Sequence, residues 1–148
     1  MSEAMEMPVL ESAMFSCTYE HTLDAKNRLF IPVKIREVVG DTFYLFAPPR
    51  EKCLYIYSPE RWEEVARAVL SKNDRNYERL IFGSVIPVET DKQGRVTIRA
   101  DFCKKVGLKK SVTIAGTGQR LELWDTDTRN KELERLQESA DLYADIRF

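Results

Sequence analysis

Apolar and polar residues alternate along several short stretches of the chain, and this alternation predicts strands. Phe15, Cys17, Tyr19 and His21 alternate with polar neighbours up to Leu23, which is the spacing of a strand with one buried face. Further strands are predicted at Leu29–Ile31, Phe43–Phe46, Cys53–Tyr57, Val85–Val88, Val96–Ile98, Ser111–Ala115 and Leu121–Trp124. Strands therefore recur through both halves of the chain.

Apolar spacings of three and four residues predict helices between the strands. A short helix is expected at Val33–Val39, because one of its faces is apolar and Gly40 stands where a C-terminal cap would lie. Ser58-Pro59 is typical of a helix start. The helix that follows has one apolar face, formed by Trp62, Val65, Ala66, Val69 and Leu70. Further helices are predicted at Tyr77–Ile81 and at Asp125–Phe148.

The pattern occurs twice, with a constant offset of 67 positions. The landmarks that repeat at this offset are Asp24–Arg28 with Asp91–Arg95, Gly40 with Gly107, and Leu54–Tyr57 with Leu121–Trp124. The repeated features are a charged segment, a glycine cap, and a strand that ends in an aromatic residue. Several landmarks at one offset indicate an internal repeat.

Each D-x-x-x-R segment is predicted to form the tip of a β-hairpin; Asp24–Arg28 is called the first tip and Asp91–Arg95 the second tip. An aspartate and an arginine four positions apart leave a three-residue loop, which commonly ends in a left-handed residue such as glycine or asparagine. The chain has Asn27 and Gly94 at that position. Each aspartate is placed to accept hydrogen bonds from the turn and to face its arginine.

Basic residues gather around both tips although the net charge of the chain is only −1. The stretch from Lys92 to Lys110 holds seven basic residues against the single acid Asp101. The basic residues around the first tip are Lys26, Arg28, Lys34 and Arg36. Such segregation can present a basic face to phosphates. Two alternatives stay open. Each Asp–Arg pair could merely tie its own hairpin, since an exposed pair contributes only about 0–1 kcal/mol. The basic residues could also form an ordinary solvated surface.

Length and composition narrow the class of protein further. The 148 residues, 43% of them apolar, suffice for one full core or two small intertwined halves. Three scattered cysteines and the lack of a secretory signal or a long apolar segment predict a cytoplasmic protein. The acidic residues 1–13 show no period and are expected to be disordered. A single histidine argues against a metal site, and no cofactor is predicted.

The residues around both tips resemble the MraZ family of bacterial transcriptional regulators. The residues that resemble its N-terminal signature are Met14-Phe15, Tyr19–Asp24, Lys26, Arg28 and Ile31-Pro32. Those that resemble its second half are Asp91, Gln93–Val96, Ile98 and Leu121–Asp125. The resemblance extends from Met14 to about Leu136, and Asn27 stands where the family usually has a glycine.

This resemblance implies an α+β fold, in which two intertwined AbrB-like swapped-hairpin halves form a small pseudo-twofold β-barrel core flanked by helices. Residues 14–82 would form the first repeat with a helical linker, and residues 83–148 the second repeat with a C-terminal helix. Family members assemble into homo-oligomeric rings and bind double-stranded DNA at direct repeats in the promoter of the division and cell-wall gene cluster, which they usually repress. Neither a membrane partner nor a small-molecule substrate is implied, and a nucleoid-associated protein is expected.

The residues expected to bind DNA come from the tips and the basic residues near them. The family motif carries over to the aspartate and arginine of each tip, and local charge adds the others. The full set is Asp24, Lys26, Arg28, Lys34, Arg36, Asp91, Lys92, Arg95 and Arg99.

Three other functions remain open from the sequence. An enzyme could use His21 near Asp24 as a base or Cys103 as a nucleophile, although one histidine suits few such sites. An AbrB-like antitoxin usually carries one hairpin unit and a disordered tail, whereas this chain repeats the unit. A structural ring without a DNA-binding role is the last alternative.

Overall fold

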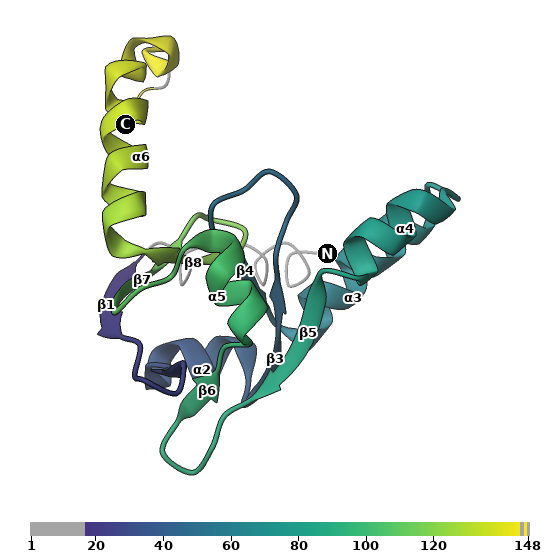
Figure 1. The fold of residues 1–148 in the computed structure, drawn as a ribbon. Coiled ribbons are helices and arrows are strands. Elements are labelled where there is room, and N and C mark those ends of the chain that lie inside the picture. Colours follow the sequence, from purple (N-terminus) through teal and green to yellow (C-terminus); the bar gives the residue numbers. More distant parts are fainter. Residues whose placement is uncertain (1–16, 146, 148) are drawn as a thin grey trace.

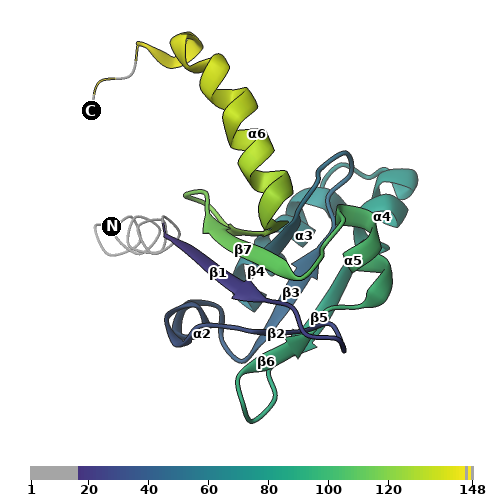
Figure 2. The same cartoon turned by 60° about the vertical axis from the view of Figure 1, so that its left-hand side comes forward.

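The computed structural model describes residues 17–145 and 147, and it is a mixed α+β structure (Figures 1 and 2). The predicted disordered segment 1–13 lies outside these residues. The strands are β1 (Thr18–Thr22), β2 (Arg28–Phe30), β3 (Thr42–Phe46), β4 (Leu54–Tyr57), β5 (Val85–Glu89), β6 (Arg95–Thr97), β7 (Ser111–Gly116) and β8 (Leu121–Asp125). The helices are α2 (Val33–Val39), α3 (Pro59–Leu70), α4 (Arg75–Phe82), α5 (Ala100–Val106), α6 (Thr126–Glu138) and the 3₁₀ turn η1 (Ala140–Tyr143).

Six strands form an antiparallel sheet in the order β1-β7-β8-β4-β3-β5, and β2 pairs with β6 in a separate two-stranded ribbon. The two halves of the chain are intertwined, because β1 pairs with β7 and β5 pairs with β3. The offset of 67 positions converts the first four strands into the last four, and the sheet order then reads the same in reverse. The strand order therefore has the pseudo-twofold symmetry that the repeat predicts.

The sheet is open, so the prediction of a small closed β-barrel is wrong. Among the described residues, β1 and β5 are its two edges, and β2 and β6 pair only with each other. The turn at each tip redirects the chain, so that the strands on either side of it take different partners. Each tip is thus a tight turn between diverging strands rather than the end of a locally paired hairpin. Alternation indicates which face of a strand is buried but does not identify its partner.

The sheet separates two apolar layers. On β4, Leu54 and Ile56 belong to the layer beneath the β2–β6 ribbon, and Tyr55 and Tyr57 belong to an aromatic layer on the opposite face. The aromatic layer is completed by Phe46, Trp62 and Trp124. This burial on both faces explains why β4 reads as a continuous apolar run.

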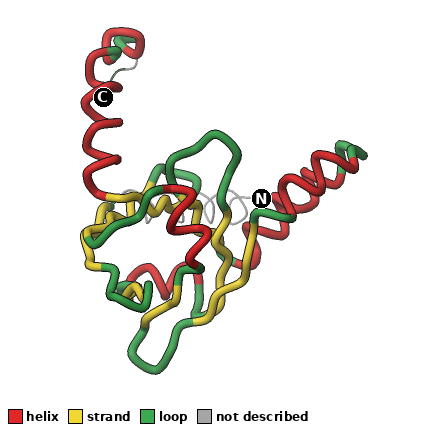
Figure 3. The backbone as a smooth tube through the Cα atoms, viewed as in Figure 1, coloured by secondary structure: helices red, strands yellow, loops and turns green. Residues whose placement is uncertain are grey.

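Helices α3 and α6 follow equivalent strands but pack differently. Helix α3 starts where it is predicted to, with the Ser58 hydroxyl accepting the Arg61 N–H at 3.2 Å, and it buries Trp62. Helix α6 has no buried residue and projects away from the sheet (Figure 3). It ends at Glu138 and gives way to η1, so it is shorter than predicted.

Candidate nucleic-acid interface

Each tip is a tight turn closed by two backbone hydrogen bonds. In the first tip, the Asp24 N–H donates to the Arg28 carbonyl at 3.1 Å, and the Asn27 N–H donates to the Asp24 carbonyl at 2.9 Å. The second tip repeats both bonds, at 2.8 and 3.0 Å. Asn27 has a φ of 59° and Gly94 one of 78°, which confirms the predicted left-handed residue in each turn.

The aspartate of each tip connects the turn backbone to the arginine side chain. Asp24 Oδ1 accepts the backbone N–H groups of Lys26 at 2.9 Å and Arg28 at 2.8 Å, and its Oδ2 accepts Arg28 Nε–H at 2.7 Å. Asp91 holds the second tip through the three matching bonds, at 2.8, 2.9 and 3.0 Å, the last from Arg95 Nε. The predicted pairing of aspartate with arginine is therefore present in both tips.

These bonds fix each guanidinium group and leave its outer end available. Within residues 17–145 and 147, the hydrogen bonds of the Arg28 and Arg95 side chains all use Nε. The two Nη groups of each arginine can therefore donate to an external acceptor. Lys26 and Lys92 are exposed beside them. In both views the tips lie toward the lower end of the molecule, away from α6, α3 and α4 (Figures 1 and 2).

The two tips are linked through the β2–β6 ribbon. The carbonyl of Asn27 accepts the Ile98 N–H at 2.7 Å, and the carbonyl of Gly94 accepts the Ile31 N–H at 2.9 Å. The left-handed residue of each tip is thus bonded to the other half of the chain. Any displacement of one tip relative to the other must break these bonds.

The ribbon places both arginines on one outer face. Leu29 pairs with Val96 and both are buried, so the residues on either side of them point outward. Arg28 lies opposite Thr97, and Phe30 lies opposite Arg95. Arg28 and Arg95 are therefore diagonal neighbours, a relation that places residues roughly 7–8 Å apart. Phe30 and Thr97 were not predicted as interface residues, although their alternation with buried neighbours is visible in the sequence.

The hydrogen bonds within the tips lower the pKa of Asp24 and of Asp91. The largest cause in each case is the backbone N–H of the tip arginine, which stabilises the charged carboxylate. The side-chain bond and the charge of the same arginine act in the same direction. Both carboxylates therefore remain ionised, and able to orient their arginines, at neutral pH.

Acidification is expected to loosen the tips only below the ordinary aspartate pKa of 3.8. Because the pKa is lower in the folded than in the unfolded protein, the stabilisation is complete above the unfolded value and is lost as the pH falls through the folded one. Carboxyl-carbon NMR titration should give a pKa below 3.8 for both residues. A pKa at or above 3.8 for either one would show that its carboxylate does not hold the turn.

The predicted DNA-binding residues on α2 have different surroundings. Lys34 is exposed. Arg36 is partly buried, its Nε–H donates to the Ile31 carbonyl at 3.0 Å, and its guanidinium carbon lies 5.9 Å from the centre of the Phe30 ring. Arg36 therefore lies against the ribbon, and its Nε–H donor is already engaged by the Ile31 carbonyl.

Arg99 is occupied by a neighbouring acid. Its Nε and Nη2 groups donate to the two carboxylate oxygens of Asp101 at 2.6 and 2.9 Å, and the guanidinium stacks 4.8 Å from the Phe102 ring centre. The pairing lowers the pKa of Asp101, mainly through the side-chain hydrogen bond. Arg99 would have to break this ion pair before all of its guanidinium N–H groups could contact DNA.

The two groups considered for an enzyme, His21 and Cys103, lie in apolar surroundings. The His21 ring packs against Phe30, with 5.7 Å between the ring centres. Cys103 is buried, and its Sγ donates to the Ile98 carbonyl at 3.7 Å. Burial raises the pKa of this thiol, so it remains protonated and weakly nucleophilic at neutral pH. The described residues also contain no group of three or more His, Cys, Asp or Glu side chains able to hold a metal ion.

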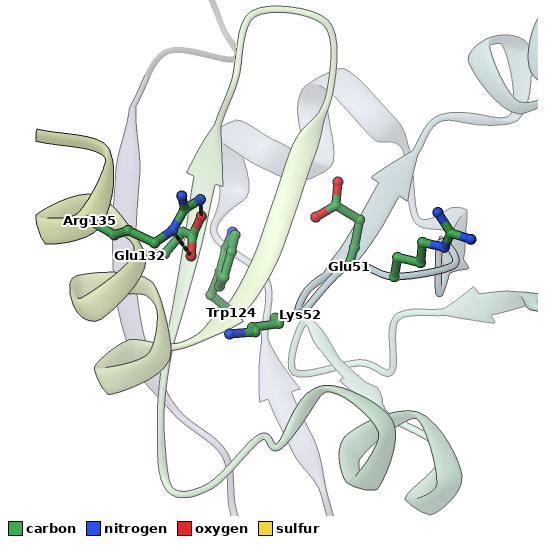
Figure 4. A pocket seen from close by; sticks show the side chains of 6 residues that line it. Glu51, Lys52, Trp124, Glu132 and Arg135 are labelled. Atoms are coloured by element: carbon green, nitrogen blue, oxygen red, sulfur yellow. Dashed lines mark hydrogen bonds and ion pairs between the residues drawn. The ribbon is translucent and has the colours of Figure 1, made fainter. Parts of the chain in front are cut away.

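A pocket of about 370 Å³ lies apart from the tips, between the β3–β4 loop and α6 (Figure 4). Its lining residues are Arg50, Glu51, Lys52, Trp124, Glu132 and Arg135. Glu132 and Arg135 form an ion pair with each other. No helix within residues 17–145 and 147 is both long and apolar enough to span a membrane.

The chain matches one protein-family model twice, over residues 14–80 and 81–144. The description of that family is "MraZ protein, putative antitoxin-like". The two matches together cover most of the chain, and each contains one of the tips. This protein therefore belongs to the MraZ family.

Proposed function

We propose that this protein is a non-enzymatic, sequence-specific DNA-binding regulator that represses the bacterial division and cell-wall gene cluster. It reads direct repeats in the promoter through its two tips. The observation that carries this proposal is that each tip arginine bonds its aspartate through Nε, so that within the described part of the chain the Nη groups of Arg28 and Arg95 are left for DNA. A cytoplasmic, nucleoid-associated location follows from this partner.

The ribbon suits the recognition of duplex DNA. The major groove is about 12 Å wide and admits a two-stranded β-ribbon. Arg28 and Arg95 lie on the outer face of such a ribbon, where each fork can donate to guanine O6 and N7 or to a phosphate. The exposed Lys26 and Lys92 are placed to neutralise phosphates.

Assembly increases the number of tips on one DNA. A single chain has only two tips, so several protomers bound to spaced repeats gain affinity by multivalency. A ring needs two unlike surfaces that meet head to tail. Leu70 and Leu80 are exposed on α3 and α4, and Leu133 and Leu136 are exposed on α6, which projects from another part of the molecule (Figure 1). These surfaces are candidates for the ring contact.

The halves of each protomer are proposed to be AbrB-like swapped-hairpin units, comprising residues 14–82 and 83–148. The exchange of strand partners between the halves supports this. A second candidate function is that of an antitoxin, which the description of the family favours. An antitoxin would neutralise its toxin even after the tips lose their arginines, whereas a DNA regulator depends on them.

Replacing Lys26 and Lys92 together by alanine is expected to weaken binding to tandem-repeat DNA and to scrambled DNA alike. Phosphate contacts carry no sequence information, so the preference for repeats should persist. The slope of log affinity against log salt should fall by about 2 per bound chain. Fluorescence anisotropy at several salt concentrations measures both quantities.

The matched control is Lys72→Ala with Lys131→Ala, which removes the same charge from exposed positions outside the tips. It should leave the salt slope close to that of the wild type. Wild-type binding that is absent or insensitive to salt would contradict the proposed function and favour the antitoxin or structural alternatives.

A further inference from the structure

The two tips have the same turn but different neighbours. Positions 30 and 36 in the first half hold Phe30 and Arg36, and the positions 67 residues later hold Thr97 and Cys103. The larger side chains of the first half face the second tip. The chain therefore breaks its own pseudo-symmetry at the proposed interface.

Phe30 and Arg36 close directly against the second tip. A Cβ atom added to Gly94 would lie 3.1 Å from Arg36 Nη2 and 3.2 Å from Phe30 Cε1, and Gly94 is buried. The bond from Arg36 Nε to the Ile31 carbonyl holds the guanidinium in this place. Ile31 in turn donates its N–H to the Gly94 carbonyl at 2.9 Å. The second tip is thus packed from the side and bonded from the backbone.

The first tip has the equivalent backbone hydrogen bond, from the Ile98 N–H to the Asn27 carbonyl. The side chain at the position equivalent to Arg36 is, however, much smaller. Cys103 Sγ donates to the Ile98 carbonyl in the position equivalent to the Arg36 bond. The cysteine side chain ends at that sulfur, so it has no guanidinium group to extend over Asn27. This contrast gives a physical reason for the different tip residues. Asparagine tolerates the left-handed turn, but in place of Gly94 its Cβ would stand unusually close to Phe30 and Arg36, at 3.1–3.2 Å, and these side chains would have to shift.

We propose that Phe30 and Arg36 are positioning residues for the second tip, and that the two tips therefore contribute unequally to DNA affinity. Both arginines are bonded to the aspartate of their own tip, but only the turn that carries Arg95 is also packed by Phe30 and Arg36. A preorganised contact loses less conformational entropy on binding, so the Arg95→Ala variant should lose more affinity than the Arg28→Ala variant. This inference rests on the proposed function for its effect on DNA, but the contacts themselves can be tested without DNA.

The first test measures amide hydrogen exchange in the absence of DNA. The N–H groups of Arg28 and Arg95 are equivalent probes, because each donates to the aspartate of its own tip. Arg95 should exchange more slowly than Arg28 in the wild type. In the Arg36→Ala variant, the Arg95 N–H should exchange at least about fivefold faster than in the wild type, and the Arg28 N–H should exchange at the wild-type rate.

The Phe30→Thr variant provides a second route to the same result, because it installs the residue that the second half carries at this place. It keeps Arg36 and should also accelerate exchange at Arg95. Unchanged exchange at Arg95 in the folded variants, or an equal increase at both tips, would overturn the proposal.

The second test is a double-mutant cycle on DNA. The effect of Arg36→Ala should disappear in the Arg95→Ala background and persist in the Arg28→Ala background. If Arg36 instead contacted a phosphate itself, its loss would still lower the salt slope by about 1 in the Arg95→Ala background, and the positioning role would be refuted. If the wild type binds no DNA, the proposed function fails and the unequal contribution of the tips fails with it. The exchange experiment still shows in that case whether Phe30 and Arg36 hold the second tip.

Discussion

Replacing both Arg28 and Arg95 by alanine is expected to lower the affinity for tandem-repeat DNA by roughly 30-fold or more. A bidentate base contact from one arginine is worth about 1–3 kcal/mol, and 1.4 kcal/mol corresponds to a factor of ten. Both side chains bond their paired aspartate through Nε, so the variant loses the Nη donors of both arginines at once. Anisotropy titrations against repeat and scrambled DNA measure the effect.

The charge-matched control for this variant is Arg67→Ala with Arg79→Ala. Both arginines are exposed on α3 and α4, away from the tips (Figure 1). The control should keep the wild-type preference for repeats, whereas the tip variant should bind repeat and scrambled DNA almost equally. The folded state should survive in both, because an exposed ion pair contributes only about 0–1 kcal/mol. Retained affinity and preference in the tip variant would contradict a role of the tips in DNA recognition.

Replacing Leu29 by alanine is expected to destabilise the protein by about 2–5 kcal/mol. Leu29 is fully buried at the centre of the ribbon, opposite Val96. Its removal leaves a cavity where the two halves of the chain meet. Both tips adjoin this ribbon, so DNA affinity should fall together with stability. Urea unfolding at a fixed protein concentration measures the free energy of unfolding.

Leu142→Ala is the matched control for the core variant, since Leu142 is 77% exposed. The same change of side chain at this surface position should alter the free energy of unfolding by less than about 0.5 kcal/mol. Equal effects of the two substitutions would show that the β2–β6 ribbon is not part of the stabilising core.

The turns of the tips were predictable because their determinants are local. An aspartate, a left-handed residue and an arginine within five positions specify the bonds that both turns contain. The Ser58 cap and the helix Val33–Val39 were predictable for the same reason. Such short-range patterns depend little on the rest of the fold.

The strand partners were not predictable in this way. Alternation in β1 identifies its two faces, but its pairing with β7 joins residues far apart in the chain, such as Tyr19 with Ile114, which are 95 positions apart. A closed barrel and an open sheet with a separate ribbon require the same alternation. The prediction of a closed barrel therefore came from the family resemblance, and the structure corrects it.

The surroundings of the basic residues were also hidden in the sequence. Charge alone places Arg36 and Arg99 in one group with the tip arginines. In the folded protein Arg99 pairs with Asp101, and Arg36 packs against Phe30 and Gly94 of the ribbon and the second tip. Charge along a chain locates a basic region but does not show which side chains are already engaged.

Hydrogen exchange with and without tandem-repeat DNA tests the central claim most directly, because it locates the contact surface without any substitution. We predict protection of residues 24–28 and 91–95 when DNA is added. Exchange in α3 and α4 should change only if protomers assemble on the DNA. DNA binding that leaves both tips unprotected and protects another surface would contradict the account.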